Sequence, residues 1–420
     1  MRTARGLRLA MGGFLVATVS ACGAAGGGGA APVLRIGALF PLGGSLAADA
    51  HDEYLGAQIA AGMVDGAGGV DGRQIQFDLR DLESGDQAPA LAASLHGDGV
   101  PAVIGAYSSA LSIPAAAAVA RQGMVYWETG AVADQVTGQA QPFVFRVGAN
   151  GSDLGGNSGR FVLQQIAPRL QRAAATLRAY LVTADDAYAH SVADAARAAL
   201  TAGGATVVGE SVYDPFLPDW TPAVSAIRAT RPDILLLSSH IPDGIAFRRA
   251  FLAAGLHVDA FMGTTMAQCL PDFGDALGAD AVGVFASDRP DDSFNPAGLD
   301  AEAQALYERF SQVWQQRTGR APSEEGIAGF SSAWALFHDV LPRAAALDAR
   351  GIAAAARTVD LPAGSLPDGG GLLFDTSGPQ MGQNTRAAAV IWQWQGVRHS
   401  VVVWPPAYAT GSVTMVPLPR

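Results

Sequence analysis

The chain has 420 residues and a formal net charge of −11 at pH 7, with 49% hydrophobic and 15% charged residues. All 27 basic residues are Arg and none of them belongs to a basic tract. This composition argues against a nucleic-acid partner, because phosphate binding needs clustered cations. Two Cys residues are too few for a fold built on disulfides, and the length predicts two or three domains.

The N-terminus has the layout of an export signal. Three Arg residues precede an apolar run from Leu9 to Val19. The run ends in Ser20-Ala21-Cys22, which resembles a bacterial lipobox, in which the Cys is acylated and becomes the new N-terminus. We therefore predict a lipoprotein signal peptide over residues 1–21 and a flexible Gly/Ala tether over 22–32. The alternative is an ordinary secretory signal with a Cys at this place by chance.

From residue 33 onward, short β-rich runs alternate with Ala-rich helical runs, which predicts mostly parallel sheets covered by helices on both faces. A glycine- and serine-rich joint over Gly148–Gly159 divides this pattern into two similar series. The first series has predicted strands at Leu34–Phe40, Ile75–Arg80, Ala102–Gly105, Val125–Trp127 and Phe143–Val147, with helices at Glu53–Gly62, Ala88–Leu95 and Ser112–Arg121. The second has predicted strands at Ala179–Thr183, Thr206–Val212, Ile234–Ser238 and Phe261–Gly263, with helices at Gly159–Ala167, Ser191–Ala202, Thr221–Thr230 and Gly244–Ala254.

The rest of the chain does not predict a third domain. Two helical stretches, Ala301–Thr318 and Gly329–Ala346, have no strand between them, and two strands follow at Leu372–Phe374 and Ala388–Trp394. The simplest arrangement returns the helices to the first lobe and the strands to the second. The predicted fold class is therefore α/β, with two doubly wound parallel-sheet lobes joined by a hinge of three crossings, which permits opening and closing. The predicted crossings lie near Val147, Ala286 and Pro362, so that lobe 1 spans 33–147 plus 286–362 and lobe 2 spans 148–285 plus 363–420.

Several short motifs occur in a defined order between about residues 33 and 396. They are Ile36-Gly37-Ala38-Leu39-Phe40-Pro41-Leu42-Gly43-Gly44-Ser45, Gly68-Gly69-Val70-Asp71-Gly72-Arg73, Ile104-Gly105-Ala106-Tyr107-Ser108-Ser109, Pro142-Phe143-Val144-Phe145-Arg146, Asp185-Asp186-Ala187-Tyr188, Phe261-Met262-Gly263 and Trp392-Gln393-Trp394. The ordered set resembles the type I periplasmic solute-binding proteins of ABC importers, in particular the leucine/isoleucine/valine-binding group.

The resemblance implies a Venus-flytrap fold that holds a small-molecule ligand between its lobes, with ABC permease subunits as partners. It implies no cofactor and no enzymatic activity. Together with Cys22, it implies a receptor that is lipid-anchored at the extracytoplasmic face of the cell membrane. We expect a monomer.

In the first lobe, the strand Ala102–Gly105 runs into Ser108 and Ser109 and then into a helix. A helix N-terminus offers free N–H groups and a partial positive charge, so a ligand carboxylate or carbonyl could be held there. The alternative is that one serine only caps the helix. The resemblance implies that Ser108 is the serine that binds the ligand carboxylate.

The loop after the next predicted strand contains Glu128, Gly130, Ala131 and Val132. The resemblance implies that Gly130 and Ala131 offer backbone groups to the ligand, and it places Val132 where the family has a threonine. Glu128 is unusual at this strand end. It either faces the cleft or is a solvated loop carboxylate.

In the second lobe, the resemblance implies that Tyr188 is the aromatic residue that closes over the ligand. His240 stands where the family often has another aromatic residue, and its alternative role is structural. Thr265 stands where the amino-acid binders have an acidic residue for the ligand ammonium. An unpaired buried ammonium costs roughly 3–5 kcal/mol. Either Asp49 or Glu128 therefore replaces that acid, or the ligand is not a zwitterion; the options are an amino acid, an amide, a urea-like compound or a carboxylate.

We find no catalytic pattern in the sequence. Gly105–Ala110 lacks the second glycine of a nucleophile elbow, and the absence of Lys excludes a phosphate-binding loop of the ATPase type. His190, His240 and His257 show no metal-ligand spacing with Cys or acidic partners. The sequence thus predicts binding without reaction, with no metal. A ligand-sensing module for a signalling partner and a secreted α/β hydrolase are the alternatives.

Overall fold

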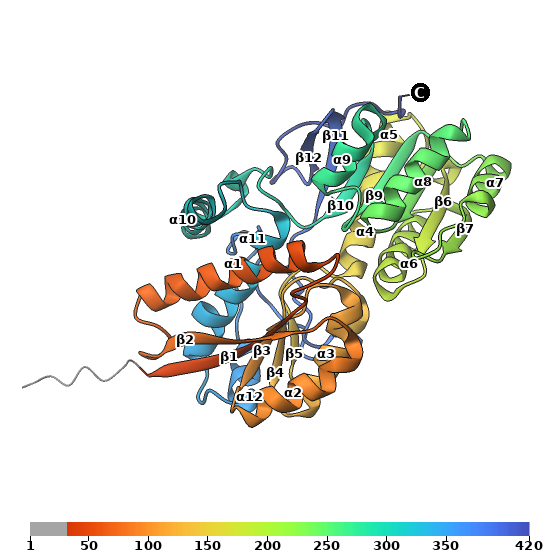
Figure 1. The fold of residues 1–420 in the computed structure, drawn as a ribbon. Coiled ribbons are helices and arrows are strands. Elements are labelled where there is room, and N and C mark those ends of the chain that lie inside the picture. Colours follow the sequence, from red (N-terminus) through yellow and green to blue (C-terminus); the bar gives the residue numbers. More distant parts are fainter. Residues whose placement is uncertain (1–31, 420) are drawn as a thin grey trace, which may run out of the picture.

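The computed structural model describes residues 32–419, which form two α/β lobes (Figure 1). The predicted lipidation site Cys22 and the tether lie outside the described residues. The first lobe contains a parallel five-stranded sheet of order β2-β1-β3-β4-β5. Its strands are β1 (Val33–Phe40), β2 (Gln74–Asp81), β3 (Ala102–Gly105), β4 (Val125–Glu128) and β5 (Val144–Arg146). All five coincide with predicted strands.

The second lobe contains a seven-stranded sheet of order β12-β11-β10-β9-β8-β6-β7. It is parallel from β10 to β7, and β11 and β12 are antiparallel to their neighbours. The strands are β6 (Arg178–Ala184), β7 (Thr206–Tyr213), β8 (Ile234–Ser238), β9 (Ala260–Thr264), β10 (Phe285–Asp288), β11 (Val390–Gly396) and β12 (His399–Trp404). The sequence analysis missed β10 and β12. Together the two sheets give the two α/β lobes that the sequence predicts.

Helices cover the faces of both sheets (Figure 1). In the first lobe they are α1 (Ala47–Gly66), α2 (Ala88–Gly97), α3 (Ser109–Arg121), α10 (Ala301–Thr318), α11 (Glu324–Trp334) and α12 (Ala349–Ala356). In the second lobe they are α4 (Gly151–Phe161), α5 (Ala167–Arg169), α6 (Ala187–Ala202), α7 (Thr221–Thr230), α8 (Ile241–Ala253) and α9 (Pro271–Leu277).

The predicted joint over Gly148–Gly159 is wrong, because most of it is helix α4. Asn150 caps this helix by accepting a hydrogen bond from the amide of Asp153 at 2.8 Å. Its glycines serve close packing against α6: a Cβ on Gly155 would lie 2.0 Å from the carbonyl oxygen of Val192. Tertiary packing therefore outweighs the low helix propensity of glycine here.

The connections between the lobes differ from the prediction in two places. The chain leaves the first sheet after Arg146, near the predicted crossing at Val147, but β10 extends the second sheet beyond the predicted crossing at Ala286. The segment Leu372–Phe374 is not a strand of the second sheet. The ring of Phe374 instead packs against Trp127 of the first lobe, with ring centroids 5.4 Å apart.

The last crossing thus follows Phe374 rather than Pro362. The segment forms isolated bridges to Leu361 and Asn384, and these short pairings keep it at the first lobe. The assignment of residue ranges to the two lobes otherwise remains a proposal.

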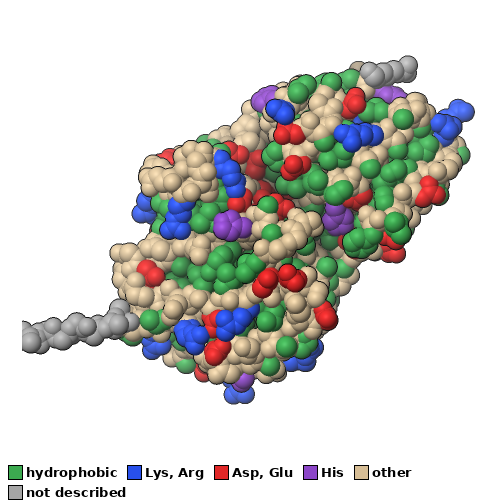
Figure 2. Space-filling model, viewed as in Figure 1, with side chains coloured by type: hydrophobic (Ala, Val, Ile, Leu, Met, Phe, Trp, Pro, Cys, Tyr) green, Lys and Arg blue, Asp and Glu red, His purple; other side chains and the backbone are tan. Residues whose placement is uncertain are grey.

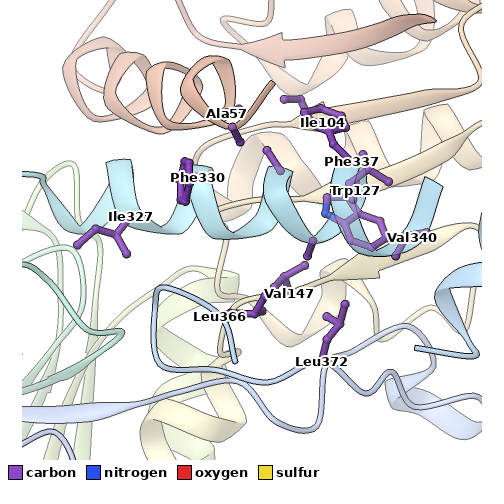
Figure 3. Packing of buried hydrophobic residues seen from close by; sticks show 14 of the residues in the cluster. Ala57, Ile104, Trp127, Val147, Ile327, Phe330, Phe337, Val340, Leu366 and Leu372 are labelled. Carbon is purple, nitrogen blue, oxygen red and sulfur yellow. The ribbon is translucent and has the colours of Figure 1, made fainter. Parts of the chain in front are cut away.

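The core of the first lobe forms where α11 and the π-helical turn after it, Ala335–Val340, lie between α1 and the sheet. Trp127 of β4 is fully buried there, and its indole nitrogen donates to the carbonyl oxygen of Ser332 at 2.8 Å. In Figure 3, Phe337 and Val340 of this helical run lie beside Trp127, and Val147 and Leu372 flank it from the connecting segments. The core therefore fixes α11 relative to the carboxyl ends of β3 and β4.

Candidate functional site

A cavity lies where the carboxyl ends of the strands of the first lobe meet the second lobe, which is where open α/β sheets bind ligands. The space between its walls amounts to about 280 Å³ with open solvent included, but the room inside it for a water-sized molecule is about 10 Å³, roughly enough for one water. Figure 2 shows that the molecule is hollowed between its two lobes and that acidic side chains gather in the hollow. The cavity is lined by Tyr107, Ser108, Ser109, Gly130, Ala131, Val132, Thr265, Met266, Arg289, Glu324 and Glu325.

Ser108 and Ser109 follow β3 and lie at the start of α3, as predicted. Ser109 holds the neighbouring loop, because its hydroxyl accepts a hydrogen bond from the amide of Ala133 at 2.9 Å. Ser108 stands at the cap position with a φ of +88°, which is rare for a residue with a side chain. Its hydroxyl caps nothing: it is buried and has no hydrogen-bond partner among the described residues. A buried hydroxyl without a partner at a strained position is a natural place for a ligand to bind.

Glu128 does not face the cleft and is not solvated, so both alternatives for it are wrong. Its side chain is fully buried, and Oε1 accepts hydrogen bonds from the amides of Thr129, Gly130 and Ala131 at 3.0, 2.8 and 2.7 Å. The hydroxyl of Tyr126 donates to Oε2 at 3.0 Å. Glu128 thus holds its own loop, and the amides of Gly130 and Ala131 already have an acceptor.

Two helices bring three further carboxyl groups to the cavity or directly behind it. Glu53 lies on α1, and Glu324 and Glu325 lie in the first turn of α11, which begins after its cap residue Ser323. The backbones of α1 and α11 are in close contact, since a Cβ on Gly329 would lie 2.0 Å from the carbonyl oxygen of Glu53. The helices thereby fix the positions of these carboxyl groups.

Arg289 is the cation of this cluster. It follows β10, its Nε lies 2.6 Å from Oε1 of Glu324, and its Nη1 donates to the carbonyl oxygen of Gly130 at 2.9 Å. Asp288 lies 3.9 Å from the same Nε. The four acids around the guanidinium outweigh its own burial and raise the pKa of Arg289, which keeps it charged.

The carboxyl groups themselves are strongly perturbed. Burial, helped by the charge of Glu128, raises the pKa of Glu53 to about 8. Burial, helped by the charge of Asp49, raises the pKa of Glu325 to about 8. Burial also raises the pKa of Glu324, although Arg289 acts in the opposite direction. At neutral pH the cluster therefore holds protons on part of its carboxyl groups.

The sequence analysis missed Arg289, Glu324 and Glu325. One signal was present: a serine cap followed by two acidic residues is typical of a helix N-terminus. It would have moved the predicted helix start from Gly329 to Glu324. Nothing in the local sequence indicates that this helix end reaches the loop after β4.

The second lobe contributes Thr265 and Met266 to the cavity. Tyr188 is not among the lining residues: it is buried, and its hydroxyl lies 2.7 Å from Oγ1 of Thr264 and donates to the carbonyl oxygen of Ser239 at 3.2 Å. It therefore supports the loop that carries Thr265.

His240 is also outside the cavity lining. It precedes α8, with Nε2 3.3 Å from Asp186 and Nδ1 3.8 Å from Asp243, and its ring packs edge-on against Tyr188 at 5.3 Å. Burial lowers the pKa of His240, but the two aspartates outweigh this and raise it overall. The predicted alternative, a structural role, fits these contacts.

Asp49 lies behind the cavity wall rather than in it. Its carboxylate accepts a hydrogen bond from the hydroxyl of Tyr107 at 3.3 Å, and burial raises its pKa. Of the predicted ligand-binding residues, the structure thus brings Ser108, Ser109, Gly130, Ala131 and Thr265 to one cavity.

Three further observations concern other kinds of site. Within residues 32–419, no group of His, Cys, Asp and Glu side chains is arranged to hold a metal ion. Over the same span, no helix has both the length and the apolar character needed to cross a bilayer. Cys269 is free and buried, and burial raises the pKa of its thiol.

Comparison with known proteins identifies relatives along nearly the whole described chain. The sequence profile of a family described as "Periplasmic binding protein" matches residues 33–393. The Leu/Ile/Val-binding protein homolog 8 of Brucella abortus is 28% identical over 375 residues, which cover 89% of this chain and 90% of the relative. Homolog 7 of Brucella melitensis is 27% identical over 392 residues, covering 92% and 96%.

Solved structures are similar in fold. A leucine-binding protein from Thermotoga maritima superimposes with a TM-score of 0.73 at 19% identity, over 89% of this chain and 98% of that one. A solute-binding protein from Rhodopseudomonas palustris in complex with benzoate gives 0.68 at 18% identity, over 90% and 98%. This fold therefore occurs in proteins that bind chemically different small molecules.

Proposed function

Because the chain belongs to the periplasmic binding protein family, we propose that it captures one small polar solute between its lobes and delivers it to an ABC importer. The observation that carries the proposal is the cavity, because residues of both lobes line it: Ser108 and Gly130 from the first, Thr265 and Met266 from the second. The ligand class is that of a branched-chain amino acid, an amide or a urea-like compound. The protein acts as a receptor and does not change the ligand.

In this mechanism the ligand first docks on the first lobe, where the hydroxyl of Ser108 has no partner. Closure then places Thr265 and Met266 over the ligand and expels water, which strengthens each polar contact. The closed form differs in shape from the open one, so the permease subunits can select it by its higher affinity for them.

A thermal-shift screen of the purified protein tests the proposal. The probes are the twenty amino acids, acetamide, urea and short carboxylates. A ligand should raise the melting temperature by an amount that grows with the logarithm of its concentration divided by its Kd, and calorimetry should give a stoichiometry of one per chain. Binding that survives Ser108→Ala unchanged, or a stoichiometry of two, would contradict this site.

We also propose that Cys22 carries the lipid anchor and that the monomer is the working form. Full-length protein expressed in a bacterium with a lipoprotein export pathway should partition with membranes, and Cys22→Ala should move it to the soluble extracytoplasmic fraction. Equal partitioning of the two forms would reject the anchor.

A further inference from the structure

We infer that the ligand carries a positively charged nitrogen and that Glu325, on the first lobe, is the residue that selects it. The inference rests on the proposed function, since it concerns the same cavity. It assigns the charge selection to a helix end of the first lobe, whereas the position on the second lobe where an acid was expected holds Thr265.

The cavity wall holds more carboxyl groups than cations, and at neutral pH part of these carboxyl groups are protonated. Glu324 and Glu325 line the cavity, and the charges of Glu53 and Asp288 act on the same guanidinium, that of Arg289. All of them are buried. Acids packed this densely in a poorly solvated place favour an added cation.

Arg289 already interacts with groups other than Glu325. The guanidinium lies within ion-pair distance of Glu324 and Asp288, and it donates a hydrogen bond to the carbonyl oxygen of Gly130. Glu325, in contrast, makes no ion pair with any residue in the described part of the chain. A cation supplied by the ligand would be the missing partner of Glu325.

An independent observation shows that the cavity is built for a ligand. The hydroxyl of Ser108 is in the wall, belongs to a residue that is 8% exposed, and has no hydrogen-bond partner among the described residues. A second buried oxygen, Oε2 of Glu53, also lacks one. The site therefore offers a hydroxyl at one wall and carboxyl groups at another, which suits a molecule with an acceptor group and a cationic nitrogen.

Binding a cation should release protons. Glu325 and Glu53 have pKa values raised to about 8, so both are largely protonated at pH 7 in the free protein. A nearby cation favours the ionised form and lowers these pKa values, so protons leave on binding and the affinity rises with pH up to about 8. The titratable and charged groups that interact with Glu325 come from several elements. They are Asp49 and Glu53 of α1, Tyr107, Cys269, Asp288 at the end of β10, Arg289 after it, and Glu324 of α11.

The experiment uses matched pairs of probes, each an amino acid and the 2-hydroxy acid with the same carbon skeleton, together with acetamide, urea and benzoate. Calorimetry at pH 7 in phosphate and in Tris, which differ in ionisation enthalpy, counts the protons released. We expect at least one amino acid to bind 100-fold or more tightly than its hydroxy acid, with proton release and with an affinity that increases up to about tenfold per pH unit between pH 6 and 8 for each proton released.

The variant Glu325→Gln should lower that affinity at least tenfold and reduce the proton release. A protonated Glu and a Gln are similar in shape and charge, so this variant should fold, which circular dichroism checks. The matched control is Glu302→Gln on α10, an exposed Glu in the first turn of its helix, which should change neither quantity.

The two proposals fail in different ways. If a hydroxy acid, benzoate, acetamide or urea binds tightly without proton release, the selection of a cation by Glu325 is wrong and the proposed function stands. If Glu325→Gln leaves the affinity for the amino acid unchanged, Glu325 is not the selecting residue. If none of the probes binds, both proposals are overturned.

Discussion

Replacing Gly130 with Ala should disrupt the cavity wall. A Cβ at this position would lie 1.8 Å from Oε2 and 2.7 Å from Cδ of Glu53, so the carboxyl group would have to move. Glu53 is fully buried, and Thr129 donates a hydrogen bond to its other oxygen, which leaves it little freedom. Overpacking of this kind costs typically ~1–3 kcal/mol. We expect the upper half of that range, because a buried polar contact is lost as well.

Urea denaturation of the ligand-free protein measures the effect in a double-mutant cycle. Glu53→Ala removes the group with which the new methyl collides, so Gly130→Ala should cost about 1.5 kcal/mol less in that background. The matched control is Gly62→Ala on the same helix as Glu53. A Cβ at Gly62 meets no atom within 4 Å, so this change should stabilise the helix by up to ~1 kcal/mol.

Two results would refute the reasoning about Gly130. One is additivity of the two substitutions to within ~0.5 kcal/mol, which would mean that the side chains do not interact. The other is a Gly130→Ala protein as stable as the Gly62→Ala control.

The remaining predictions concern the hydroxyl groups and the acids of the site. Ser108→Ala should change the unfolding free energy by less than ~1 kcal/mol, because the hydroxyl has no hydrogen-bond partner to lose. The same variant should bind the ligand at least tenfold more weakly by calorimetry. A loss of unfolding free energy as large as the loss of binding free energy would contradict this prediction. Tyr188→Phe should lower stability by ~1–3 kcal/mol in urea denaturation, because its hydroxyl is hydrogen-bonded inside the second lobe, and a purely ligand-binding defect would be evidence against this. Glu53 and Glu325 have pKa values of about 8, above the ordinary 4.5, so their contribution to stability is complete below about pH 4.5 and is lost as pH rises to about 8. The unfolding free energy of the ligand-free protein, measured by urea denaturation, should therefore fall across that window by at most ~5 kcal/mol for either group. An unfolding free energy that does not change with pH would contradict the raised pKa values.

The sequence predicted the parts of the site that depend on local pattern. The strands β3 and β4 are short apolar runs, and the polar residues that follow them, Ser108 and Gly130, were placed correctly at the carboxyl edge. The same local reasoning failed for α4, since its glycines indicate a loop unless the close approach of α6 is known.

The acidic part of the site could not be predicted in the same way. Glu324 is far from Gly130 in sequence, and the two are brought to one cavity only because α11 packs against α1. The role of Glu128 was equally hidden, because a carboxylate that accepts three amides of its own loop looks in sequence like one that faces a ligand.

The cavity divides its chemistry unequally between the two halves of the molecule. Both carboxyl groups of its wall come from α11, while the β9 loop of the other half adds only a hydroxyl and a thioether, from Thr265 and Met266. The carboxyl groups of the cavity wall and the side chains that limit the size of the ligand on the opposite side therefore come from separate segments of the chain. Exchanging the β9 loop should therefore change the size of the solute that fits while leaving the carboxyl groups of α11 in place.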